Sequence, residues 1–243
     1  MLRDPLISSR DKLLIVILIA LIFGGMSFCY SFFGFFSPQA KTIGRLDVFG
    51  SLTPQEIGGH FAFGFVAGLA FRKLRMAVLC GLMALAVDAD HVLNVAGFEI
   101  QGRMSHSIPF IIIASVLVGI ITILILNYLM RGNDKSFTRR ANWTNKGANS
   151  VNDWGSHLSP DILVLHTFSR FLIISASAAI SHVAYDTFVD AHANFPLLVP
   201  FVYTDFYIPQ IYGLPIEGAA ISLVCLWYTA VQGNMHASRI SVF

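Results

Sequence analysis

The sequence predicts an all-α, polytopic integral membrane protein with about six transmembrane helices and both termini in the cytoplasm. Of its 243 residues, 55% are hydrophobic and only 12% are charged, about half the charged fraction of an ordinary soluble domain. Long stretches carry no charge, and the mean hydropathy is +0.67. This composition excludes disorder and argues against a soluble enzyme, because most side chains must face lipid.

The first four spans follow from charge-free intervals, because about 20 apolar residues cross the hydrocarbon core as a helix. No charge lies between Lys12 and Lys41, which predicts a span over residues 13–36. A secretory signal peptide is the competing interpretation, but the apolar run is too long for one. The next three predicted spans cover residues 57–71, which the basic cluster Arg72, Lys73 and Arg75 closes, residues 76–97 and residues 107–130.

The second half of the chain predicts a polar loop, a fifth span, a proline-rich loop and a sixth span. Residues 131–160 are rich in Asn, Ser, Gly, Lys and Arg, which is typical of a loop. The fifth span covers about 162–189. Four prolines and six aromatic residues in 194–215 favour an interfacial loop or a re-entrant turn, and the sixth span covers about 218–236. Residues 1–243 are therefore expected to form a single transmembrane helical domain.

The distribution of Lys and Arg predicts the orientation, because cytoplasmic loops hold the excess of these residues. With the N-terminus inside, three face the opposite side, namely Lys41, Arg45 and Arg103, and Arg170 lies near the cytoplasmic start of the fifth span. Twelve are cytoplasmic: Arg3, Arg10, Lys12, Arg72, Lys73, Arg75, Arg131, Lys135, Arg139, Arg140, Lys146 and Arg239. The 131–160 loop is then cytoplasmic and the 194–215 loop is outside.

In this topology, ionisable side chains from four separate spans reach the same extracytoplasmic depth. They are His60, Asp88, Asp90, His91, His106, His182, Asp186 and Asp190. Ionisable groups inside spans are costly, and they normally pair with one another or bind an ion. The alternative for any one His taken alone is a hydrogen-bonded interfacial residue. Of the other histidines, His192 falls in the outer loop, and the topology places three on the opposite side: His157, His166 and His236.

Local spacing favours a metal site. His182 and Asp186 are four residues apart, so on a helix they share one face and can present a nitrogen and an oxygen to the same ion. Asp88 and His91 are three apart and also share a face, whereas Asp90 points elsewhere unless the helix has ended. His and Asp ligands without Cys suit zinc, manganese or iron, and the number of carboxylates leaves room for one or two ions.

Glycines around His60 form a small-residue face. Gly59, Gly64 and Gly68 let another helix approach closely. We interpret them as packing residues that position His60 and take no part in chemistry.

Four short motifs follow one another in a fixed order: His60 with Gly64, Asp88-Ala89-Asp90-His91, Ser105-His106-Ser107 and His182-Val183-Ala184-Tyr185-Asp186. Together they resemble the membrane-bound metal-dependent hydrolases of bacteria and archaea, some of which are inner-membrane proteins under LexA control. That family has an early His, an Asp-x-Asp-His element, a His-Arg-Gly-x-Thr-His-Ser element and a later His-x-x-x-Asp. The resemblance covers roughly residues 57–201 and includes a Pro-Phe segment at Pro200-Phe201.

The chain departs from the family pattern in two places. Val87 stands where the family has a Pro before the first Asp. In an ungapped alignment, Gln101, Gly102 and Arg103 stand where the third element has its first His, its Arg and its Gly. Either one metal ligand is missing or the Arg has moved by one position. The site then binds metal with fewer histidines, or the chain keeps the fold as a non-catalytic subunit.

The cluster and the resemblance predict a metal-dependent hydrolase at the outer leaflet, acting on a phosphoester or another polar lipid-linked group. The cofactor is a divalent transition metal, with zinc or manganese favoured, as one or two ions. The expected ligands are His60, Asp88, His106, His182 and Asp186. Asp90 or His91 is expected to be the general base or to support a ligand, and Arg103 to clamp an anion. Interfacial snorkelling is an equal alternative for Arg103.

Two other function classes remain open. A non-catalytic accessory or structural subunit of a larger membrane complex is favoured by Gln101 and by the small extramembrane mass. An ion or solute transporter ranks last, because the ionisable residues cluster near one interface and no paired broken helices are found. The resemblance places the chain in the plasma (inner) membrane of a prokaryote as a multi-pass protein. The expected partners are the lipid bilayer and other membrane subunits, and a net charge of +2 gives no support for nucleic acid.

Overall fold

The computed structural model describes the backbone of residues 9–33, 53–92, 104–144, 160–202 and 204–240, and the side chains of 13–31, 53–92, 104–128, 164–202 and 204–231. The all-α prediction is confirmed. The α-helices of this part of the chain are α1 (Ser9–Phe33), α2 (Pro54–Leu69), α3 (Leu74–Ala86), α5 (Ile108–Thr144), α6 (Pro160–Val189) and α7 (Gly213–Ile240). Three short 3₁₀-helices and two strands accompany them: η3 (Val87–Asp90), η4 (Met104–His106), η5 (Gln210–Tyr212), β1 (Asn194–Phe195) and β2 (Phe206–Tyr207).

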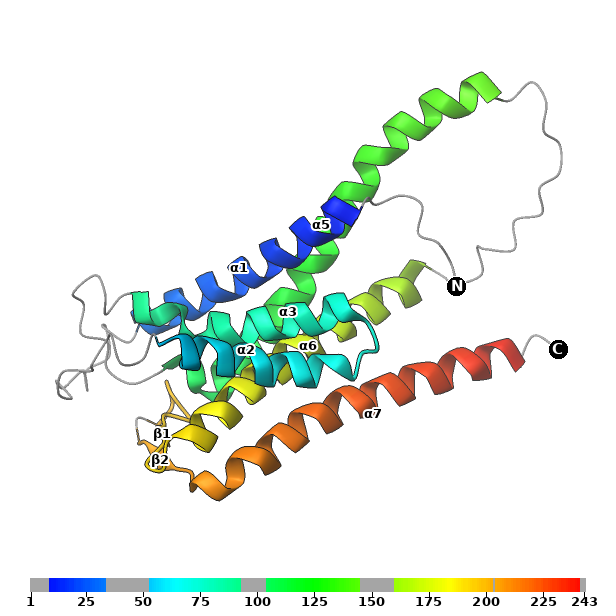
Figure 1. Cartoon of the computed structure of the whole chain (residues 1–243). Coiled ribbons are helices and arrows are strands. Elements are labelled where there is room, and N and C mark those ends of the chain that lie inside the picture. The colour runs from blue at the N-terminus through cyan, green and yellow to red at the C-terminus, as the bar shows by residue number, and fades with distance from the viewer. Residues whose placement is uncertain (1–8, 34–52, 93–103, 145–159, 203, 241–243) are drawn as a thin grey trace.

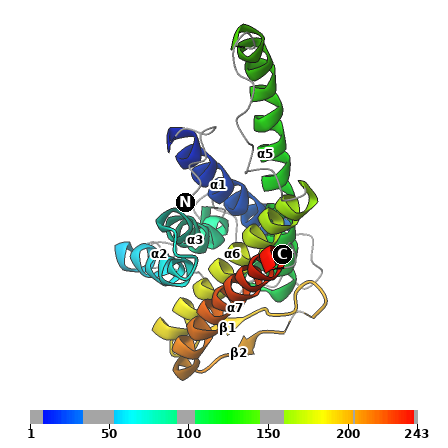
Figure 2. The same ribbon diagram turned by 90° about the vertical axis from the view of Figure 1, so that its right-hand side faces the viewer.

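Consecutive α-helices run in alternating directions (Figure 1). One end of the bundle, here called the sheet end, holds the antiparallel β1–β2 pair, the C-terminal ends of α1, α3 and α6, and the N-terminal ends of α2, α5 and α7. The other end, the turn end, holds the turn between α2 and α3. Helix α6 lies centrally and contacts α2, α3, α5 and α7 (Figure 2). The apolar core includes Phe23, Leu79, Met83, Phe110 and Ile174.

Within the described ranges, four helices are long and apolar enough to cross a membrane, over Leu13–Ser31, Ile108–Tyr128, Val164–Val189 and Gln210–Val231, which marks the chain as a membrane protein. Helices α2 and α3 match the second and third predicted spans but have only 16 and 13 residues. At a rise of about 1.5 Å per residue, α2 is about 24 Å long, whereas the hydrocarbon core measures about 30 Å. Four of the six predicted spans therefore correspond to helices that are long enough to cross a membrane. Helices α2 and α3, at the second and third predicted spans, form a shorter antiparallel pair.

Local signals explain where this short pair begins and ends. The side chain of Thr53 accepts a hydrogen bond from the Glu56 N–H, and Pro54 follows at the first helical position, so α2 starts before the predicted Ile57. Arg72 adopts a positive φ of 55°, which reverses the chain before α3. At Val87 the α-helix tightens into η3, which holds Asp88 and Asp90.

The prediction of a loop from residue 131 is wrong over its first part, because α5 continues to Thr144. The charged residues after Met130 mark where the sequence stops being apolar, and the Arg and Lys among them are good helix formers. A change in composition at the edge of an apolar run therefore does not end a helix. The remaining residues of the predicted loop, 145–159, lie outside the described part of the chain.

The proline-rich segment 194–215 interrupts the helices, as predicted. It contains β1, β2 and η5, and α7 starts at Gly213, five residues before the predicted start of the sixth span. Pro215 fits within the first turn of α7, because the N–H groups there have no partner in the helix.

Glycines bring α2 close to its neighbours. A Cβ on Gly64 would lie 2.6 Å from Ala84 Cβ and 2.7 Å from the Cys80 carbonyl oxygen of α3. A Cβ on Gly59 would lie 2.0 Å from the Tyr185 ring of α6. Both contacts are shorter than a methyl group allows, so glycine at these positions sets the distance from α2 to α3 and α6. This supports the interpretation of the glycines as packing residues.

We expect Gly64→Ala to destabilise the protein by about 1–3 kcal/mol, because α2 and α3 must separate to admit the methyl group. Gly58→Ala is the matched control on the same helix, since a Cβ there meets nothing within 4 Å. It should be neutral or stabilising by about 0.5–1 kcal/mol. Thermal unfolding of both variants in detergent tests this, and equal stabilities would contradict the close approach of α2 and α3.

Candidate metal centre

Five elements meet at the sheet end and contribute the ionisable side chains of the candidate site. His60 lies on α2, Asp88 and Asp90 lie on η3, and His106 lies on η4. The last turns of α6 contribute His182 and Asp186, four residues apart on one face. The fifth element is α1, whose Ser27 and Ser31 hydroxyls donate to the Val87 carbonyl and to Asp90. Helices α2 and α6 and the 3₁₀-helices η3 and η4 carry these ionisable side chains, and the α1 hydroxyls help to fix the geometry.

Asp186 lies among three imidazoles. Its Oδ2 atom is 3.1 Å from His106 Nε2 and 3.6 Å from His182 Nε2, and its Oδ1 atom is 3.4 Å from His60 Nε2. The rings of His60 and His182 stack with centroids 4.0 Å apart and an interplanar angle of 12°. One carboxylate therefore faces imidazole nitrogens from α2, η4 and α6.

Asp88 lies among a second, overlapping set of imidazoles. Its Oδ2 atom is 3.2 Å from His60 Nε2, and its Oδ1 atom is 3.4 Å from His182 Nε2 and 3.3 Å from His91 Nε2. The Nε2 atoms of four histidines thus converge on two carboxylates. Within this group, one atom from each of His60, His182 and Asp186 lies within 4.8 Å of the others, and the same holds for Asp88, His106 and His182.

Hydrogen bonds away from the centre fix the protonation of two rings. His182 Nδ1 lies 2.8 Å from the Ala84 carbonyl oxygen, in the last turn of α3 where carbonyls lack helical partners, so Nδ1 carries the proton and donates. The Ser105 hydroxyl donates to Asp90 Oδ2 at 3.0 Å and lies 3.2 Å from His106 Nδ1. The Ser105 oxygen therefore accepts the Nδ1–H of His106. A neutral ring that carries its proton on Nδ1 has a lone pair on Nε2 that can bind a metal ion.

His106 Nε2 and His182 Nε2 lie only 2.7 Å apart, so a proton or a metal ion must lie between the two nitrogens. Two unprotonated nitrogens at this distance repel unless a cation lies beside them. A divalent ion removes the repulsion, since each nitrogen then donates its lone pair to the metal. The hydrogen bonds from each Nδ1–H to an oxygen are those that metal-binding histidines usually make.

Burial makes this arrangement costly without compensation. His106 and His182 are 0% exposed, His60 is 3% and Asp186 is 6% exposed. Buried carboxylates must be paired or coordinate an ion. Three imidazoles and two carboxylates without a thiolate suit zinc or manganese, so the residues present fit a divalent metal.

The structure brings together all five predicted ligands, namely His60, Asp88, His106, His182 and Asp186, with Asp90 and His91 beside them. Asp90 does not point away, as a continuous helix would require, because η3 has replaced the α-helix there. Asp190 is exposed and accepts a hydrogen bond from the His192 N–H in the turn after α6, so neither joins the cluster. Arg103 and Gln101 lie outside the described residues.

Sequence reasoning missed the hydroxyls that orient the site. Ser31 donates to Asp90 Oδ2 at 2.9 Å, and Tyr185 donates to the Gln55 carbonyl at 3.2 Å while its ring meets His60 edge-on. Ser27 and Ser31 are four residues apart in an apolar span, so their shared face was a visible signal. The role of Ala84 carries no such signal, since it acts through its backbone oxygen.

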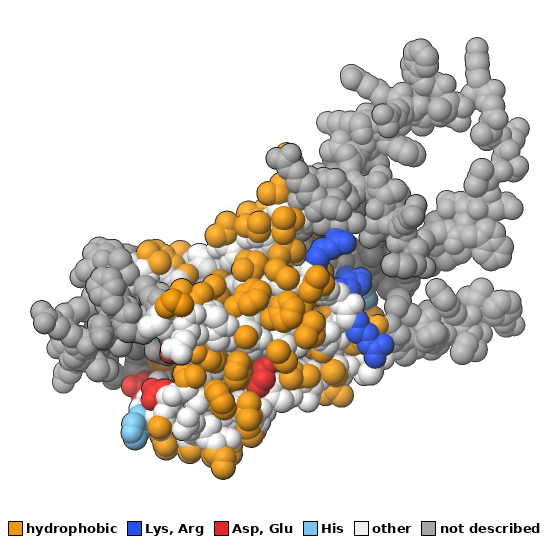
Figure 3. Space-filling model, viewed as in Figure 1, with side chains coloured by type: hydrophobic (Ala, Val, Ile, Leu, Met, Phe, Trp, Pro, Cys, Tyr) orange, Lys and Arg blue, Asp and Glu red, His pale blue; other side chains and the backbone are white. Residues whose placement is uncertain are grey.

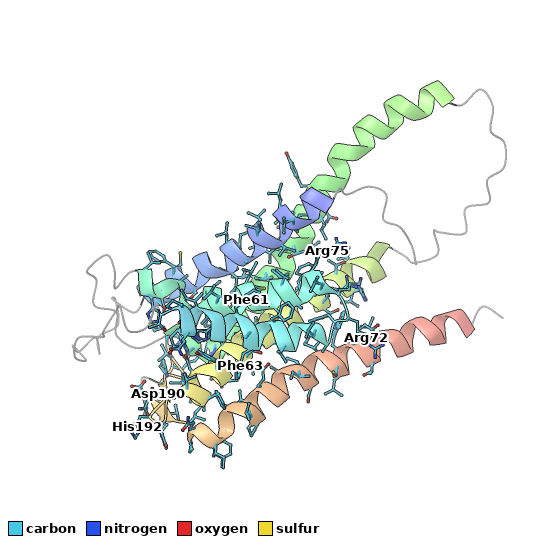
Figure 4. All side chains as sticks on the ribbon, viewed as in Figure 1. Phe61, Phe63, Arg72, Arg75, Asp190 and His192 are labelled. Carbon is cyan, nitrogen blue, oxygen red and sulfur yellow. The ribbon has the colours of Figure 1, made fainter. Side chains whose placement is uncertain are left out.

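Charge is divided between the two ends of the bundle. Figure 3 shows Lys and Arg at the turn end and His and most of the visible Asp and Glu at the sheet end, with an apolar surface between them. Figure 4 places Arg72 and Arg75 at the turn end and Asp190 and His192 at the sheet end. His166 lies away from the cluster, where it contacts Arg170. The candidate site therefore lies at the acidic end of an apolar bundle.

Comparison with known proteins gives no assignment: no protein-family model, no curated protein and no solved structure matches this chain. The functional argument rests on the residues and their geometry.

We expect the purified protein to bind at least one Zn²⁺ or Mn²⁺ per chain. His182→Ala should weaken that affinity at least about 10-fold, because it removes one ligand and the hydrogen bond to Ala84. His166→Ala is the matched control, since it makes the same change on α6 away from the cluster. Metal analysis and isothermal titration of the three proteins measure the effect. Equal metal affinity in all three would remove His182 from the ligand set.

Proposed function

We propose that this protein is a membrane-embedded metal-dependent hydrolase of the plasma membrane, acting at the extracytoplasmic interface on a phosphoester or another lipid-linked group. The observation that carries the proposal is the convergence of buried imidazole Nε2 atoms on Asp88 and Asp186, with two Nε2 atoms 2.7 Å apart. The order of motifs that resembles the membrane-bound hydrolases supports the same conclusion.

His60, His106, His182, Asp88 and Asp186 would hold the metal. A divalent ion bound there supplies Lewis acidity toward the scissile group and activates water near neutral pH. Asp88 is the more exposed of the two carboxylates, because 13% of its side chain is accessible, compared with 8% for Asp186. Substrate would therefore approach from the side of Asp88.

The remaining residues orient the ligands and exclude water. Asp90 acts through the Ser105 hydroxyl on His106, and the Ala84 carbonyl fixes His182. Tyr185 covers the edge of His60, and Gly59 leaves room for the Tyr185 ring. Interactions that fix ring orientation typically contribute 10–100-fold to metal affinity or activity.

The proposed orientation places the sheet end outside and both termini in the cytoplasm, with six passes that include the short helices α2 and α3. The basic residues Arg72 and Arg75 at the turn end support it, because Lys and Arg are retained on the cytoplasmic side. The alternating directions of the six described α-helices are consistent with both termini on the side of the turn end.

Cysteine labelling tests this orientation in a protein whose three native cysteines are replaced by alanine. Ser150→Cys, in the 131–160 segment, should react with a membrane-impermeant maleimide only after the cytoplasmic side is opened. His192→Cys, which is exposed at the sheet end, should react in intact cells. The reverse pattern would overturn the orientation and place the site on the cytoplasmic side.

An accessory subunit of a larger membrane complex is the second candidate. It is favoured by Gln101 and Gly102, which stand where the resembling family has His and Arg. In such a subunit the cluster would stabilise the fold or an assembly, and no substrate would be turned over.

Asp186→Asn separates the two candidates. The amide keeps the size of the side chain but loses the charge that attracts a divalent ion, so a hydrolase should lose activity by about 100-fold or more while remaining inserted. Asp190→Asn, the same change on an exposed residue four positions along, should keep its activity. The assay uses phospholipid headgroup release and generic phosphoesters at neutral pH with added zinc or manganese. Equal activity of wild type and Asp186→Asn on every substrate would favour the accessory subunit.

A further inference from the structure

Asp88, Asp90 and His91 form a second group of potential ligands beside the first. Asp88 Oδ1 lies 3.3 Å from His91 Nε2, and one atom from each of the three residues lies within 4.8 Å of the others. His91 joins neither of the groups that contain His182. The 3₁₀ geometry of η3 produces this cluster, because it brings Asp88, Asp90 and the following His91 to one side.

Asp90 carries an independent indication of a cation. Its side chain is 4% exposed, and its Oδ2 atom accepts hydrogen bonds from Ser31 and Ser105. Its Oδ1 atom is buried and has no hydrogen-bond partner among the described residues. A buried carboxylate oxygen without a partner is costly, and a metal ion next to Asp88 and His91 would satisfy it.

One ion cannot use all of these donors. The two groups together offer four imidazoles and three carboxylates, whereas zinc takes about four ligands and manganese about six. The charge leads to the same conclusion. Three carboxylates and one divalent ion leave a net charge of −1 at a buried site, whereas two ions leave +1, which suits an anionic substrate.

We propose a second divalent-cation site formed by Asp88, Asp90 and His91, which shares Asp88 with the site of His60, His106, His182 and Asp186. Asp88 lies between the two, since its Oδ1 atom faces both His91 and His182. Two-ion sites with a spacing of about 3.5–4 Å bind the phosphoryl group between the ions. On the proposed function, on which this step rests, the substrate group is therefore a phosphate ester. Asp90 and His91 then bind the ion and are not the general base expected from the sequence.

Titration of the metal-free full-length protein with Mn²⁺, followed by electron paramagnetic resonance, tests the second site. Wild type should bind two Mn²⁺ per chain, with a spin-coupled spectrum because Asp88 bridges them. His91→Ala and Asp90→Asn should each bind one Mn²⁺ with an uncoupled spectrum. The Asn side chain can still accept the Ser31 and Ser105 hydrogen bonds, and the single retained ion shows that the first site is folded. His192→Ala, an exposed His at the same end, is the control and should bind two.

Several results would overturn the second site. Wild type could saturate at one Mn²⁺ or at none, or both variants could still bind two coupled ions. Loss of all Mn²⁺ binding in both variants would instead make Asp90 and His91 part of a single site. The outcome is distinguishable from that of the proposed function. Two bound ions without hydrolysis of any phosphoester would contradict the hydrolase alone, whereas hydrolysis by a protein that binds one ion would contradict the second site alone.

Discussion

Burial of charge inside an apolar bundle is the constraint on which the rest of this structure depends. Asp90, Asp186 and the rings of His60, His106 and His182 are all less than 7% exposed in a protein that is 55% hydrophobic. Water cannot solvate them, so every ionisable group at this depth needs an opposite charge, a hydrogen bond or an ion. The oxygen and nitrogen partners described above satisfy most of this need, with Asp90 Oδ1 the exception, and the helices must hold positions that keep these partners there.

Close helix packing is what holds those positions. Gly64 lets α2 approach Ala84, whose carbonyl fixes His182, and Gly59 lets the Tyr185 ring sit beside His60. In lipid, helices associate through shape and small residues, so these glycines contribute to the site without touching it. Helix α3 ends near the site, where the Ala84 carbonyl in its last turn contacts His182 of α6.

The sequence predicted which side chains lie together at the candidate site, but it predicted less of the fold around them. Spacing and depth were sufficient for His60, His182 and Asp186, because helical periodicity fixes which side chains share a face. They were insufficient to predict the position of Asp90, because the residue types in 86–90 do not indicate that the α-helix changes to a 3₁₀-helix there. The length of α5 was missed for a related reason. Polarity indicates the medium around a segment and not its backbone conformation, and residues 131–144 are polar yet helical.

Helix α1, which the sequence predicts only as a membrane span, contributes hydrogen bonds to the candidate site. Its Ser27 and Ser31 face η3, where they bond to the Val87 carbonyl and to Asp90 Oδ2. Asp90 in turn receives the Ser105 hydroxyl, and Ser105 sets the proton on His106. A chain of hydrogen bonds therefore leads from an apolar span near the N-terminus to the imidazole that lies closest to His182. A hydroxyl in lipid has no water to bond with. These hydrogen bonds therefore satisfy the serine hydroxyls and, at the same time, orient the groups of the site. Removal of α1 would leave Asp90 without one of its donors and the Val87 carbonyl without the Ser27 hydroxyl, so the first helix belongs to the candidate site as much as the helices that carry its imidazoles and carboxylates.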